Sequence, residues 1–146
     1  MREYTIYWIE EEFAHHYFGR EKMFYHLFEE YTSAIGELRP ILNKQVNYVT
    51  KPIPVLHINQ FIQNEMKTKT NYRFIEELHI FQANKNKSKA TLHVSEQHLT
   101  LVGTGEYEAE MTFFELLRKW DSRFLAVDTN QMRFGWLTPI KQRKFV

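Results

Sequence analysis

The sequence contains no cysteine among its 146 residues. A disulfide, a thiolate nucleophile and a zinc site with cysteine ligands are therefore excluded, and nothing indicates an oxidising compartment. No stretch approaches the roughly 20 apolar residues that a membrane-spanning helix needs. The first residues also lack the long apolar run of a signal peptide. We therefore expect a cytoplasmic protein that does not bind membranes.

A strong charge of one sign is also missing, because 19 basic and 18 acidic side chains give a formal net charge of +1. Basic residues gather at 85–89 and in the C-terminal tail, at Lys141, Arg143 and Lys144. Nucleic-acid binding needs a concentrated positive face, so we interpret 85–89 as a solvated loop and expect no specific complex with DNA. The alternative is a nucleic-acid-binding protein that uses aromatic stacking together with the basic tail.

Apolar side chains are plentiful: 43% of the residues are hydrophobic and 16% are aromatic. At this chain length, that composition supports one domain over residues 1–146 that buries about two-thirds of the surface of its unfolded form. Aromatic side chains suit both cores and interfaces, so composition alone does not separate a structural role from a binding role.

Hydrophobic spacing predicts a mixture of strands and helices. We expect strands at 4–9, 78–82, 90–95, 99–103, 124–128 and 132–137, and helices near 11–18, 20–35, 54–66 and 106–120. Residues 40–47 are ambiguous. The order of elements predicts the α/β class with mixed α+β character: a single mixed sheet of about five to six strands with helices packed on it.

Two of the expected helices are clearly amphipathic. The helix at 106–120 places Phe113, Leu117 and Trp120 on one arc, which is typical of burial against a sheet. The helix at 20–35 has a single apolar face. Its members are Met23, Phe24, Leu27, Phe28, Tyr31, Ala34 and Ile35.

Three patterns could indicate chemistry, and each has a simpler interpretation. Glu106 and Glu110 share a helix face and could support a small hydrolase, but glutamates at a helix start commonly serve the helix dipole. His93 and His98 flank a tight turn without a third metal ligand. The glycine-containing residues 103–105 lack the Gly-Lys-Ser/Thr ending of a phosphate loop. We therefore predict no catalytic residue, no metal site and no cofactor.

Phe13 and Tyr17 are four residues apart and so lie on one face of the expected first helix. Ala14 and Phe18 form a neighbouring stripe with the same spacing. The spacing alone favours core positions for all four side chains. An exposed Phe/Tyr pair with a polar rim would instead be typical of a binding hot spot.

Gln45 and Tyr48 precede a Pro-x-Pro turn at 52–54. Prolines lower the entropy cost of holding a loop in place, so neighbouring side chains are preorganised for binding. A tyrosine that covers the edge of the core is an equally supported interpretation of Tyr48.

Four stretches of the sequence resemble one known family. They are EEFAHHYFGRE at 11–21, YVTKPIPVLH at 48–57, GEYEAEMTFFELLRK at 105–119, and RFGWLTP at 133–139 with the terminal FV. In this order and spacing they resemble the SirA family of spore-forming bacteria, over nearly the whole chain. Several coincident blocks are far more specific than any single short motif.

The resemblance implies a role in sporulation. SirA-like proteins bind the N-terminal domain of the replication initiator DnaA, which is a protein-interaction module, and so stop initiator assembly. The family's initiator-binding positions correspond to Phe13, Tyr17, Gln45 and Tyr48 in this chain. The resemblance therefore implies a non-enzymatic inhibitor of replication initiation that acts through DnaA.

Overall fold

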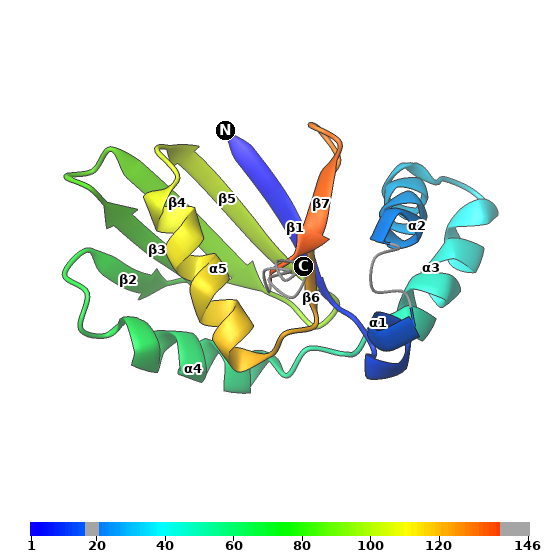
Figure 1. Ribbon diagram of the computed structural model, residues 1–146, viewed down its shortest axis with the longest axis horizontal. Helices are drawn as coiled ribbons and strands as arrows, with labels where there is room; N and C mark the ends of the chain where they lie inside the picture. The colour runs from blue at the N-terminus through cyan, green and yellow to red at the C-terminus, as the bar shows by residue number, and fades with distance from the viewer. Residues whose placement is uncertain (17–20, 138–146) are drawn as a thin grey trace, which may run out of the picture.

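The computed structural model describes residues 1–16 and 21–137 (Figure 1). Its elements, in chain order, are β1 (Arg2–Trp8), α1 (Glu11–His16), α2 (Glu21–Ser33), α3 (Leu38–Val49), α4 (Val55–Met66), β2 (Tyr72–Ile75), β3 (Leu78–Ala83), β4 (Ser88–Val94), β5 (Leu99–Gly105), α5 (Glu108–Trp120), β6 (Phe124–Asp128) and β7 (Arg133–Trp136). The α/β class with helices packed on a single sheet is confirmed.

The sheet of the described residues has seven strands, in the order β2-β3-β4-β5-β1-β6-β7. The prediction of five to six strands was therefore too low. Every neighbouring pair is antiparallel, which corrects the expected mixed pairing. Hairpins join most neighbours and force this direction, and β1 occupies the position between β5 and β6.

Strand β2 was missed and helix α3 was left ambiguous, because their local signals are unusual. The hairpin between β2 and β3 turns at Glu76 and Glu77, both with positive φ, where asparagine or glycine is the usual signal. Helix α3 contains Pro40 as its third residue. Proline is tolerated there because the first backbone N–H groups of a helix have no partner within the helix.

Helices cover the sheet on both faces, and β1 shows the division because its side chains alternate. Ile6 and Trp8 point into a core shared with α4 and α5. Tyr7 and Ile9 point into a second core, shared with α1, α2 and α3. In Figure 1, α5 crosses one side of the sheet, whereas α1–α3 lie beyond β6 and β7. Strand β6 is covered on both faces, and all five of its residues are buried.

The predicted burial of the α5 arc is confirmed for Phe113 and Leu117, which are fully buried, while Trp120 is half-buried. The single apolar face predicted for 20–35 is confirmed only in part. Met23 is exposed, and Ile35 lies beyond the end of α2 and is 85% exposed. The helix ends before Ile35 because the chain turns at Gly36, whose φ of 67° suits glycine.

Candidate protein-binding surface

The surface that carries the predicted binding residues is formed where α1 meets the C-terminal end of α3. The backbone N–H of Glu10 donates to the Val49 carbonyl at 2.8 Å. Ile9 and Thr50 form an isolated antiparallel bridge, and the N–H of Lys51 donates to the Trp8 carbonyl at 2.7 Å. The end of α3 is thereby fixed to the end of β1, directly before α1 begins.

The structure brings three of the four predicted site residues together. The Phe13 and Tyr48 rings meet edge to face, with their centroids 5.1 Å apart. Gln45 is exposed three residues before Tyr48 on α3. The fourth residue, Tyr17, lies outside the described residues, so its placement stays a prediction.

Phe13 and Tyr48 differ in their degree of burial. Tyr48 is 73% exposed although it is a large aromatic side chain. Phe13 is half-buried and packs on the second core. Phe13 therefore serves the core and the surface together, whereas Tyr48 contributes mainly to the surface.

An open groove of about 420 Å³ adjoins Tyr48. Its walls are mostly apolar and come from two helices, α2 and α3. The lining residues are Leu27, Lys44, Gln45, Tyr48 and Val49. Leu27, Lys44 and Val49 were not predicted as site residues, because the groove exists only when α3 forms and packs against α2. The amphipathic spacing of 38–49 was the available signal.

The core beneath this surface is tightly packed. Tyr7 of β1 stacks on Phe28 of α2, with ring centroids 3.8 Å apart and planes within 7°. Val46, between Gln45 and Tyr48 on α3, is buried in the same core. A rigid core beneath the surface lowers the entropy cost of presenting exposed side chains to a partner.

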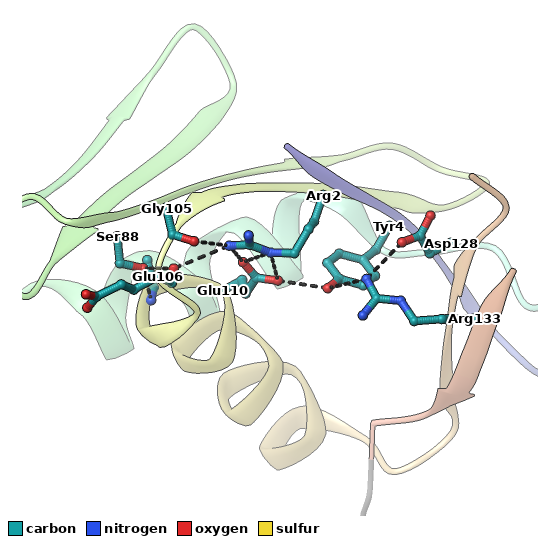
Figure 2. Close-up of polar contacts among 9 residues, drawn as sticks. Arg2, Tyr4, Ser88, Gly105, Glu106, Glu110, Asp128 and Arg133 are labelled. Atoms are coloured by element: carbon teal, nitrogen blue, oxygen red, sulfur yellow. Dashed lines mark hydrogen bonds and ion pairs between the residues drawn. The ribbon is translucent and has the colours of Figure 1, made fainter. Parts of the chain in front are cut away.

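The glutamates considered for acid–base chemistry lie in different environments (Figure 2). Glu110 is almost fully buried in α5 and is paired with Arg2 of β1, whose Nη2 lies 2.5 Å from Oε1. The Tyr4 hydroxyl donates to the same carboxylate at 2.8 Å. Glu106 precedes α5, and its side chain accepts a hydrogen bond from Asn84. The prediction that Glu106 and Glu110 share a helix face was therefore wrong.

The Glu110 carboxylate belongs to a chain of polar contacts that crosses four elements, α5, β1, β6 and β7. Arg133 of β7 donates to the buried Asp128 at 3.0 Å and lies 3.4 Å from the Tyr4 hydroxyl. Burial, together with the neighbouring Glu110, raises the pKa of Tyr4 to about 12. We interpret these contacts, drawn in Figure 2, as a connection that holds β1, α5, β6 and β7 together.

The glycines at 103 and 105 make room for their neighbours. A Cβ on Gly103 would overlap the carboxylate of Glu110, and a Cβ on Gly105 would overlap the Lys87 carbonyl. Gly105 also has a φ of 73°, which favours glycine. Both glycines lie in β5: Gly105 is its last residue, before the connection to α5, and Gly103 accommodates the Glu110 carboxylate.

The histidine pair and the basic loop were also singled out in the sequence. His93 is exposed, and His98 is half-buried with its ring 5.8 Å from that of Tyr7. The described residues contain no group of three potential metal-ligating side chains. The solvated loop predicted at 85–89 is shorter than expected: residues 84–87 form the exposed β3–β4 turn, whereas Ser88 and Lys89 belong to β4 and Ser88 is buried. Lys141, Arg143 and Lys144 lie outside the described residues. Within 1–16 and 21–137, no helix has both the length and the apolar character needed to cross a membrane.

Comparison with known proteins identifies the family. The family model described as sporulation inhibitor of replication protein SirA matches residues 2–141. The chain belongs to the SirA family. A relative with that same description, from Bacillus subtilis (strain 168), is 44% identical over 147 residues, covering 99% of this chain and 99% of the relative. The SirA family assignment therefore covers both layers of helices and the whole sheet.

Proposed function

We propose that this chain inhibits the initiation of DNA replication during sporulation by binding the N-terminal domain of DnaA, without catalysis. The observation that carries the proposal is Tyr48, which is highly exposed yet held against Phe13 beside an apolar groove. Membership of a family described as sporulation inhibitors of replication supports the same function.

Exposing the large aromatic ring of Tyr48 to water is costly unless a partner covers it. A tyrosine buries a large rigid surface when a partner covers it, and its hydroxyl can still form a hydrogen bond. Tyrosine is among the residue types enriched in binding hot spots. Tyr48 already has one edge against Phe13, so little side-chain freedom is lost when a partner binds. Gln45 adds an adjacent polar group that can fix the orientation of the partner.

The test is a calorimetric titration of the purified protein with the DnaA N-terminal domain. We expect the wild type to bind and Tyr48→Ala to lose about 2–4 kcal/mol of binding free energy, a loss of tens to several hundred fold in affinity. Tyr107→Ala is the matched control, because Tyr107 is also an exposed tyrosine but lies at the start of α5. Absence of wild-type binding, or equal affinities in all three proteins, would overturn the proposal.

The same purified protein also tests the alternative that the chain binds nucleic acid. With a net charge of +1, we expect no complex with single- or double-stranded DNA at physiological salt. A complex with origin DNA alone that survives moderate salt would instead favour nucleic-acid binding.

A further inference from the structure

One face of the sheet is covered by helices at one end only. Helices α4 and α5 pack on the opposite face of β3, β4 and β5. Helices α1–α3 pack on this face at β1 and β6, against Tyr7, Leu125 and Val127. In Figure 1, α1–α3 lie beyond β6 and β7, away from β2–β5. In the described part of the chain, this face of β2–β5 is therefore left without a helix, and we call it the uncovered face.

The uncovered face carries several aliphatic side chains. Ile75 of β2 is paired with Leu78 of β3, and Ile80 follows on the same face of β3. Val102 of β5 lies two strands further along the sheet. Ile75 is 46% exposed, and the other three side chains are half-buried without packing on either core. Contiguous apolar side chains at a surface mark interaction sites.

Charges of opposite sign stand at the two ends of this face. One residue from each of five paired strands lies in a single row: Arg73 (β2), Ile80 (β3), Thr91 (β4), Val102 (β5) and Glu3 (β1). Neighbouring strands lie about 4.8 Å apart, so the row is about 19 Å long. Arg73 and Glu3 are exposed, and neither takes part in an ion pair among the described residues. A row that is basic at one end and acidic at the other is complementary to itself after a two-fold rotation.

A cleft beside Glu3 suits a guanidinium group. It has a volume of about 210 Å³ and lies between α2 and the β1 end of the uncovered face. Carboxylate, hydroxyl and amide groups line much of it, from Glu3, Thr5, Thr32, Thr129 and Asn130. Arginine has five N–H donors and no acceptor, so it needs a site rich in acceptors. Arg73 of a second copy can donate to these groups.

We infer that the uncovered face is a two-fold interface with a second copy of this chain, in which Arg73 of each copy enters the Glu3 cleft of the other. A two-fold axis along β4 also sets Ile80 of one copy opposite Val102 of the other, with the two sheets about 10 Å apart. Five strands with about 20 Å of length bury about 500 Å² per copy. This area is below the roughly 800 Å² per partner of a standard interface, so we expect a micromolar dimer. Helix α3 lies outside this face, so the dimer keeps two Tyr48 surfaces open.

The test is sedimentation velocity of the full chain over a concentration series. It contains no DnaA, so its outcome is independent of the proposed function. With rising concentration, we expect the wild type to pass from the mass of one 17.8 kDa chain to that of two. Arg73→Glu and Glu3→Arg should each weaken dimerisation at least tenfold, because each places like charges opposite one another twice in the interface. Lys67→Glu is the matched control and should dimerise as the wild type does, because Lys67 is an exposed basic residue directly after α4.

A mixture of the two charge-reversed variants gives the sharper result. In a heterodimer of Arg73→Glu with Glu3→Arg, both contacts again join opposite charges. We expect this mixture to dimerise with an affinity close to that of the wild type, at concentrations where each variant alone is a monomer. Such a rescue also shows that both variants are folded.

A further readout uses only the wild type. In methyl NMR spectra, dilution from dimer to monomer should shift the Ile80 and Val102 signals and leave those of Leu56, an exposed residue of α4, in place. Unmoved Ile80 and Val102 signals in a dimerising protein would place the interface elsewhere and overturn the inference. Failure of the two variants to associate when mixed would overturn it as well. A wild type that stays monomeric at every concentration would also overturn it and leave the face to another kind of partner.

Discussion

Helices α5 and α3 are both amphipathic, but their apolar side chains differ in how far they are buried. In α5, Phe113 and Leu117 are fully buried against the sheet. In α3, Leu38, Ile41 and Tyr48 are at least half exposed. The apolar surface of α5 is explained by folding alone, because hydrophobic burial is the main favourable term in folding. The exposed surface of α3 contributes little to folding, and it is the surface that we propose for partner binding.

The same contrast separates the two layers. The α4–α5 layer holds a buried polar network as well as apolar side chains, since His79 bonds Tyr72 at 2.7 Å and Asn59 at 2.8 Å. The α1–α3 layer buries its inner side chains and leaves an apolar groove open on its outer side. One layer should therefore respond to substitution mainly through stability, and the other mainly through binding.

The largest expected effect is on stability in the α4–α5 layer. Phe113→Ala removes a fully buried ring and should lower the free energy of unfolding by about 3–5 kcal/mol. Urea denaturation measures this loss. Met111→Ala is the control on the same helix, because Met111 is half exposed. A Phe113→Ala protein of wild-type stability that fails to bind DnaA would instead move the interface to α5.

The next effect is a dependence of stability on pH in the same layer. Burial lowers the pKa of His79 to about 4, against 6.5 for an ordinary histidine. The unfolded chain therefore takes up this proton first as the pH falls. The His79 contribution to stability is complete above pH 6.5 and is lost progressively between pH 6.5 and 4, by about 3 kcal/mol.

An NMR titration isolates His79 from the other groups that become protonated in this range. The His79 ring signals should stay those of a neutral imidazole until the pH approaches 4. Protonation of His79 near pH 6.5 in the folded protein would contradict the proposed burial effect.

A smaller loss of stability is expected from the polar contacts of α5. Glu110→Gln removes the negative charge that faces Arg2 and Tyr4 and should cost about 2 kcal/mol. Glu108→Gln, at an exposed position in the same helix, should cost less than about 0.5 kcal/mol. Binding to DnaA should persist in folded Glu110→Gln. Selective loss of inhibition in that variant would revive the hydrolase alternative.

The smallest effects on stability are expected in the α1–α3 layer. Phe13→Ala should cost about 1 kcal/mol because the ring is half-buried on the second core. Tyr48→Ala should stay within about 0.5 kcal/mol of the wild type, because the side chain is mostly in water. Thermal unfolding checks both values. A loss of several kcal/mol in Tyr48→Ala would reassign Tyr48 to the core.

Sequence patterns predicted the fold best where local and tertiary signals agree. The hairpin of β4 and β5, the start of α4 directly after Pro54 and the buried arc of α5 follow from spacing and turn residues. Strand β2 was missed because its turn uses two glutamates with positive φ. Helix α3 was left ambiguous because Pro40 obscured its start, although proline fits the first turn.

The candidate site was harder to predict from sequence patterns than the fold. The spacing of Phe13 favoured a core position, and only the family resemblance pointed to binding. The structure shows that this residue is half-buried while touching the exposed Tyr48. Leu27 lines the groove but was not predicted as a site residue, because its position there depends on the packing of α2 against α3. The amphipathic spacing of 38–49 is a local signal for a helix, but it does not show which element that helix packs against.

The most direct test of the central claim is made in sporulating cells. The ratio of origin to terminus DNA is measured while either the wild type or Tyr48→Ala is produced at equal protein levels. We expect the wild type to lower this ratio, because new rounds of replication stop, and Tyr48→Ala to leave it close to the ratio in cells without the protein. Full inhibition by Tyr48→Ala would contradict the claim that this surface acts on the initiator.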